Sequence, residues 1–153
     1  MLKCQYPRRL HRALRMTAIA SLSAISLSTV LWIFPSWAVT PQQVPNPRSS
    51  GGWVTDMADI ISPETEAQLN QRIDELEAYN GSQIAVVTVR ETIPSPTPKV
   101  FATELFNLWG IGQEGEDNGV LFLVSVGDRR AEIETGYGAE GVLPDGRVGR
   151  ILD

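Results

Sequence analysis

Acidic side chains gather in two glycine-rich stretches, GIGQEGEDN at 110–118 and GYGAEG at 136–141. Carboxylate oxygens suit hard cations such as Ca²⁺ and Mg²⁺, and glycines allow backbone carbonyl oxygens to approach such an ion. Asp117 and Glu140 are the strongest candidate ligands, and the further candidates are Asn118, Asp145 and Asp56. The competing interpretation is a solvated acidic loop, because the spacing of these residues is not that of an EF-hand.

Other chemistries are excluded by residue type. The single cysteine and the single histidine, Cys4 and His11, both lie in the first 38 residues. The rest of the chain therefore cannot form a Ser-His-Asp or Cys-His nucleophile system, or a zinc site with His or Cys ligands. GYGAEG matches the G-x-G-x-x-G pattern, but it follows a predicted hairpin strand and not the first strand of a βαβ unit. We therefore interpret it as a glycine loop and not as a dinucleotide site.

The N-terminus has the three-part layout of a secretory signal peptide. Residues 1–15 are basic, residues 16–34 are apolar, and Ser36-Trp37-Ala38 places small residues where a signal peptidase needs them. We predict a signal peptide over residues 1–38, with cleavage after Ala38. The alternative is an uncleaved membrane anchor, because the apolar run is about long enough to span a bilayer. Arg8-Arg9 resembles a twin-arginine signal only weakly.

Charge is distributed unevenly along the 153 residues. Five of the 13 Lys and Arg residues precede residue 39 and all 18 acidic residues follow it, so residues 39–153 carry a net charge of −10. Such a surface repels nucleic acid and anionic lipid, and we expect no nucleic-acid partner.

The predicted elements give an α/β fold. Residues 39–52 are rich in Pro, Gly and Ser and are predicted to be a linker without apolar periodicity. Downstream, the patterns predict helices over 62–80 (with Ser62 as N-cap and Gly81 as C-cap), over 99–109 and from Pro144-Asp145, and strands over 83–89, 119–126 and 130–135. The first two strands should be parallel, and the third forms an antiparallel hairpin with Glu132 and Glu134 facing outward. The last helix reaches Asp153 without a cap, so we expect the natural chain to continue.

This topology predicts where the acidic stretches meet. The loop 110–118 enters its strand at the amino end, and the antiparallel strand 130–135 finishes at that same edge of the sheet. Five residues should therefore converge there, namely Asp117, Asn118, Tyr137, Glu140 and Asp145. Asp56 joins them only if the segment 53–61 crosses that edge.

Several short motifs over residues 53–153 together resemble the TPM domain family. They are Val54-x-Asp56, Gly81-Ser82-Gln83-Ile84, Leu108-Trp109-Gly110-Ile111-Gly112, Asp117-Asn118-Gly119, Asp128-Arg129-Arg130, Gly136-Tyr137-Gly138-x-Glu140 and Asp145. The resemblance implies an α/β/α sandwich and metal binding. Together with the signal peptide, the sequences of these motifs are most similar to the cyanobacterial and thylakoid-lumen branch of the family. That branch is associated with photosystem II repair and, in plants, with acid phosphatase activity.

The expected function is therefore an exported accessory module, in the thylakoid lumen or the periplasm, that binds calcium or magnesium and assists photosystem II components. One alternative is a metal-dependent acid phosphatase of weak activity, although the chain has no P-loop and no Asp-x-Asp phosphatase motif. Another is a general exported binding domain. Membrane association would come from an uncleaved N-terminal segment or from a C-terminal anchor after Asp153.

Overall fold

The computed structural model describes residues 38–152, and the predicted signal peptide lies outside this range except for Ala38. Its strands are β1 (Val54–Asp56), β2 (Gln83–Val89), β3 (Gly119–Ser125) and β4 (Arg130–Thr135). Its α-helices are α1 (Pro63–Asn80), α2 (Pro98–Trp109) and α3 (Asp145–Leu152), and three short 3-10 helices are η1 (Pro41–Gln43), η2 (Pro47–Ser50) and η3 (Tyr137–Ala139). Within residues 38–152, no helix has the length and apolar character needed to cross a membrane.

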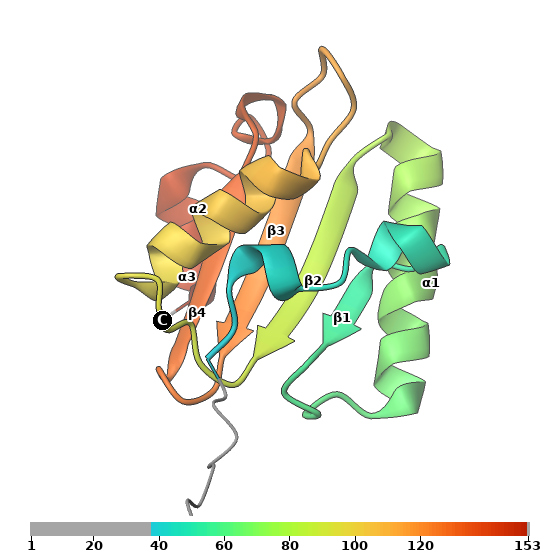
Figure 1. Ribbon diagram of the computed structural model, residues 1–153. Helices are drawn as coiled ribbons and strands as arrows, with labels where there is room; N and C mark the ends of the chain where they lie inside the picture. The colour runs from blue at the N-terminus through green and yellow to red at the C-terminus, as the bar shows by residue number, and fades with distance from the viewer. Residues whose placement is uncertain (1–37, 153) are drawn as a thin grey trace, which may run out of the picture. The chain divides into compact units, whose positions relative to one another are not determined.

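The strands form one mixed sheet in the order β1-β2-β3-β4 (Figure 1). β1, β2 and β3 are parallel, and β4 is antiparallel to β3. The α/β class and the parallel pair with a hairpin strand are confirmed. β1 was not predicted as a strand, because a three-residue strand is too short to show a period of two. It pairs with β2 through Val54 opposite Val86 and Asp56 opposite Thr88.

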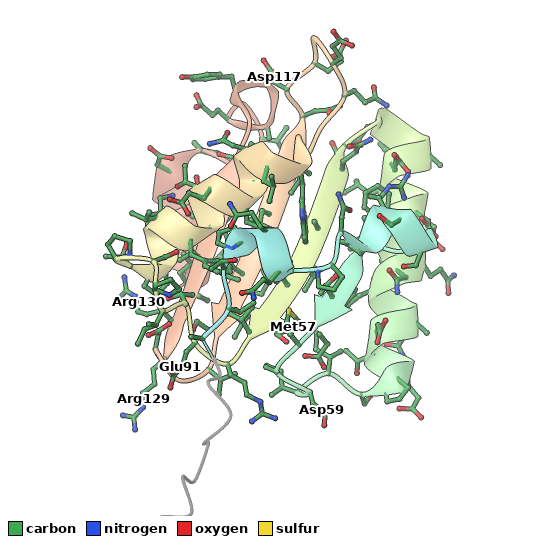
Figure 2. The ribbon with its side chains drawn as sticks, in the orientation of Figure 1. Met57, Asp59, Glu91, Asp117, Arg129 and Arg130 are labelled. Carbon is green, nitrogen blue, oxygen red and sulfur yellow. The ribbon has the colours of Figure 1, made fainter. Side chains whose placement is uncertain are left out.

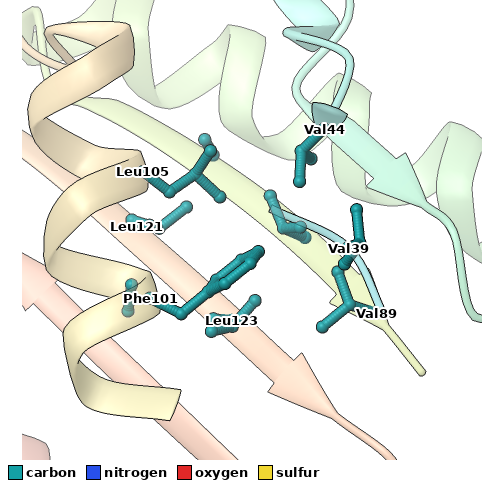
Figure 3. Packing of buried hydrophobic residues seen from close by; sticks show 10 residues of the cluster. Val39, Val44, Val89, Phe101, Leu105, Leu121 and Leu123 are labelled. Carbon is teal, nitrogen blue, oxygen red and sulfur yellow. The ribbon is translucent and has the colours of Figure 1, made fainter. Parts of the chain in front are cut away.

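Helices cover the two faces of the sheet because side chains of a strand alternate between faces. On one face, Val87, Val89, Leu121 and Leu123 pack with Phe101 and Leu105 of α2 (Figure 3). On the other face, Val54 and Val86 pack with Trp53 and with Ile73 of α1. This arrangement agrees with the sandwich that the sequence resemblance implies.

The predicted helix caps are present in α1. The Ser62 hydroxyl accepts a hydrogen bond from the Thr65 amide at 3.2 Å, and Gly81 ends the helix in the left-handed conformation at φ 77°. α2 begins one residue earlier than predicted, with Pro98 in its first turn and Thr97 as the N-cap. α3 begins at Asp145, as the Pro144-Asp145 pair predicted. Local capping chemistry therefore locates the helix ends well.

The stretch 39–52, predicted to be a linker, packs into the domain. Val39 and Val44 are 7% and 4% exposed and belong to the core beneath α2, against which η1 packs. Arg48 of η2 stacks on the Trp53 ring at 3.8 Å. Single valines between prolines and 3-10 turns have no helical or strand period, so the sequence pattern gave no sign of their burial.

The predicted outward direction of Glu132 and Glu134 is also wrong. These side chains are only 12% and 15% exposed. Glu134 accepts hydrogen bonds from Lys99 Nζ and from Thr103 Oγ1 of α2, each at 2.7 Å. The sequence showed alternation along β4, but it did not show that α2 lies over the polar face.

Candidate functional site

Two glycine-rich loops pack backbone against backbone at the amino end of β3. We call these loops, residues 110–118 and 136–145, the rim. The Gly138 amide donates to the Asp117 carbonyl at 3.0 Å, and the Gly136 amide donates to the Gly119 carbonyl at 2.9 Å. A Cβ atom at Gly136 would overlap the Asp117 carbonyl oxygen, and one at Gly138 would overlap that of Glu116. Glycine is therefore required here so that the two loops can meet.

Asn118 and Gln83 fix the first of these loops. Asn118 Oδ1 accepts from the Gln113 amide at 2.9 Å, and its Nδ2 donates to the Gly81 carbonyl at 3.0 Å. Gln83 Oε1 accepts from the Gly112 amide at 3.0 Å. Both polar groups of the Asn118 side chain, a predicted metal ligand, therefore form hydrogen bonds that hold the loop in place.

The remaining predicted ligands of the rim face solvent. Asp117, Glu140 and Asp145 are all exposed, and none of the three carboxylates forms a hydrogen bond or an ion pair with another described residue. Asp117 has a left-handed backbone at φ 49°, a conformation that Asp tolerates better than most side chains. Tyr137, predicted to converge here, is 83% exposed. The structure thus places these side chains on the exposed surface of the rim.

A hollow of about 270 Å³ lies beside the first loop of the rim. Asp117 and Glu114 line it, together with Phe106, Asn107 and residues 110–113. This hollow offers hard oxygen donors next to solvent. It is the one concavity among those described that carries a predicted site residue.

The donor chemistry of the rim fits a hard cation, but its geometry is open. Across residues 38–152, no group of three or more His, Cys, Asp or Glu side chains comes together in a way that could hold a metal ion. A cation at the rim would therefore be bound by one or two carboxylates, completed by backbone carbonyls and water. Such a donor set predicts weak affinity.

Asp56, the fifth predicted ligand, lies at the opposite end of the sheet. Its partner in the register is Thr88, near the carboxyl end of β2, whereas Asp117 precedes the amino end of β3. Figure 2 shows Asp117 at one end of the molecule and Met57, the residue after Asp56, toward the other. The segment 53–61 continues from β1 into α1 at the carboxyl end and does not cross the rim, so Asp56 is not part of the rim.

The contacts of Asp56 explain why it is there. Its carboxylate accepts hydrogen bonds from the Thr88 hydroxyl and from the amides of Ile60 and Ile61, the latter two at 3.0 and 2.8 Å. Burial acts to raise the pKa of Asp56, but these hydrogen bonds outweigh it and leave the pKa below its ordinary value. Asp56 therefore shapes the turn between β1 and α1 as an ionised acceptor.

Asp128 has the same role in the β3–β4 turn, and sequence analysis did not single it out as a structural residue. Its Oδ2 accepts from the Ser125 hydroxyl at 2.6 Å, and from the hydroxyl and the amide of Thr92 at 2.7 and 3.0 Å. The Ser125 hydrogen bond contributes most to a pKa below the ordinary value, against desolvation. The Gly127-Asp128 pair signals a turn, but nothing local links it to Thr92, 36 residues earlier.

The one lysine of the described residues is engaged in an ion pair. Lys99, the only lysine after residue 38, lies in the first turn of α2 and pairs with Glu134 of β4 at 2.7 Å. The exposed carboxylates of the rim can attract cations.

Comparison with known proteins identifies one family and several solved structures of similar fold. The family model of the TPM domain matches residues 54–153. The solution structure of the N-terminal domain of a Porphyromonas gingivalis protein is 35% identical, with a TM-score of 0.67, over 74% of this chain and 73% of that chain. An N-terminal domain from Corynebacterium glutamicum is 18% identical, with a TM-score of 0.51, over 65% and 60%, and shows the fold alone. The search among curated proteins gave no match.

Proposed function

We propose that this chain, which belongs to the TPM domain family, is an exported accessory module whose rim binds calcium or magnesium weakly. The observation that carries the proposal is the contrast in how its acids are used. Asp117 and Glu140 are exposed and unpaired beside closely packed carbonyl groups, whereas Asp56 and Asp128 are engaged by hydrogen bonds. A carboxylate that has no donor from its own fold keeps its oxygens available to a hard cation.

We extend this proposal to photosystem II assembly or repair in the thylakoid lumen. Its support is the resemblance of the motifs and of the N-terminal segment to that branch of the family. The two solved structures are N-terminal domains of proteins from Porphyromonas gingivalis and Corynebacterium glutamicum, and they support the fold and not this role. Finding photosystem genes in the source genome is the first check on this extension.

Calorimetric titration of residues 39–153 with calcium tests the metal site. At matched ionic strength we expect saturable heat at millimolar concentration, and its loss when Asp117→Asn and Glu140→Gln are combined. Glu64→Gln with Glu104→Gln is the matched control, since it removes two exposed charges from α1 and α2 instead. Heat that is absent from the wild type, or unchanged in the rim variant, would show that the assignment is wrong.

Phosphate release separates this proposal from the acid phosphatase alternative. The rim carries five exposed acids, which repel a phosphate ester unless a cation neutralises them; they are Glu114, Glu116, Asp117, Glu140 and Asp145. We expect purified residues 39–153 to release no phosphate from p-nitrophenyl phosphate, with or without calcium or magnesium. Metal-dependent turnover that the Glu140→Gln variant loses would favour the enzyme instead.

A further inference from the structure

We infer that folding seals the peptide bond between Ala38 and Val39, so that the N-terminal segment has to be removed before the domain folds. This inference rests on the proposed export of the chain. The step itself is a hydrolysis: a signal peptidase adds water across the bond, leaving a carboxylate on Ala38 and an ammonium group on Val39. The structure bears on when that bond is accessible.

On the carboxyl side of the bond, the chain enters the core at once. Val39 is 7% exposed, and Val44, five residues later, is 4% exposed. Both belong to the cluster that contains Val89 of β2 and Phe101 and Leu105 of α2 (Figure 3). The residue that would become the new N-terminus is therefore a core residue of the folded domain.

Hydrogen bonding holds the same stretch in place. Ala38 forms a parallel bridge with Glu91, just after β2. The Thr40 amide donates to Gln43 Oε1 at 2.8 Å, and the Gln43 amide donates back to the Thr40 carbonyl at 2.9 Å. Residues on both sides of the bond thus have fixed partners in the folded state.

A peptidase needs several residues around the bond extended in its own cleft, so it acts on chain that is free of the fold. Freeing this bond requires withdrawing Val39 and Val44 from the core together. From the burial of two valine side chains we expect the folded chain to be cut about 100-fold more slowly than the unfolded chain, or slower still. If the domain were exported after folding, as by the twin-arginine pathway, the Ala38–Val39 bond would already be inaccessible to the peptidase. Such a chain would keep its N-terminal segment.

A delay experiment tests the inference with the full chain. The precursor, residues 1–153, is diluted from denaturant into detergent-containing folding buffer, and signal peptidase is added after increasing delays. We expect the yield of product beginning at Val39 to fall with the same time constant as folding. Tryptophan fluorescence reports that folding, because Trp53 becomes buried to 1% exposure. A yield that does not depend on the delay overturns the inference.

A spacer variant provides the matched control. Insertion of a flexible Gly-Ser segment between Ala38 and Val39 leaves the domain sequence intact and moves the bond away from the core. We expect this precursor to be cut equally well at every delay, which also shows that the enzyme remains active in the presence of folded protein. If the spacer precursor loses yield with delay as the natural one does, burial of Val39 is not the cause. If neither precursor is cut without delay, the bond is not a processing site and the inference falls, while the calcium titration still tests the rim separately.

Discussion

The two ends of the sheet both carry acids, and they use them in opposite ways. At the carboxyl end of the parallel strands, Asp56 and Asp128 accept hydrogen bonds from hydroxyls and amides of their own fold. At the rim, Asp117 and Glu140 are exposed and make no such bonds with the described residues. The same residue type is therefore a structural acceptor in one place and an available ligand in the other. The difference lies in whether the neighbouring loop supplies donors.

The rim is nevertheless held together by hydrogen bonds, which come from its backbone and from side-chain amides. Glycines allow the two loops to touch, while Asn118 and Gln83 tie the first loop to the start of β2. The carboxylates take no part in this framework. Removing these carboxylates should consequently weaken cation binding without destabilising the fold. At the carboxyl end, removing Asp56 or Asp128 should instead destabilise the fold.

The largest effect is expected from Asp128→Ala. This change leaves the Ser125 and Thr92 hydroxyls, both in residues that are 1% exposed, without their acceptor. We expect a loss of about 3 kcal/mol in the free energy of unfolding. Glu116→Ala at the rim is the control, for which we expect a change of less than about 0.5 kcal/mol. Urea denaturation measures both, and equal losses would remove the distinction between the two ends.

The next effect concerns the backbone framework of the rim. Gly138→Ala places a methyl group against the Glu116 carbonyl, whereas Gly141→Ala meets nothing within 4 Å. We expect the first change to cost about 2 kcal/mol of stability and to weaken calcium binding, and the second to be neutral or slightly stabilising. If the two variants have the same denaturation midpoint, the loops are not held by this close approach.

Acid should destabilise the protein through the carboxyl end. The pKa values of Asp56 and Asp128 are lowered in the folded state, so their contribution is fully present above the unfolded-state pKa of about 3.9. It is lost as the pH falls through the lower folded-state values. We expect the urea concentration at the denaturation midpoint to decrease as the pH is lowered below about 4. Combining Asp56→Asn with Asp128→Asn should make this decrease less steep. An acid limb that stays as steep in the Asp56→Asn, Asp128→Asn variant as in the wild type would contradict the comparison.

The smallest effect is expected from the rim variant, Asp117→Asn with Glu140→Gln, at neutral pH without calcium. Exposed acids that have no partner contribute little, so the free energy of unfolding should change by less than about 0.5 kcal/mol. Thermal unfolding in a chelating buffer measures this, and a loss above about 1 kcal/mol would show that these acids support the fold.

Local patterns were sufficient to predict much of this fold. The caps at Ser62 and Gly81, the buried strands and the parallel pairing all follow from spacing and turn chemistry. The approach of the loop 136–140 to Asp117 also followed from topology, because an antiparallel strand ends where its parallel neighbour begins. These features depend on residues that are close in sequence or on the direction of neighbouring strands.

What the sequence could not show depends on long-range contacts. The burial of Val39 and Val44 requires knowledge of α2, and the role of Asp128 requires Thr92. The place of Asp56 was left conditional because the direction of β1 was not known, and the partners of Asn118 at Gln113 and Gly81 were not visible in the sequence. The sequence alone does not distinguish an acid or amide side chain that forms hydrogen bonds within the protein from one that binds an ion.

Calcium titration followed by nuclear magnetic resonance tests the central claim most directly, since it reports which end of the sheet responds. We expect saturable shifts of backbone amides confined to the rim, residues 110–118 and 136–145, when calcium is added to residues 39–153 at constant ionic strength. The chemical shifts of the amides of residues 60, 61 and 92, which donate to Asp56 and Asp128, should not change. Saturable shifts centred on those carboxyl-end amides, or no saturable shift in the rim, would contradict the account.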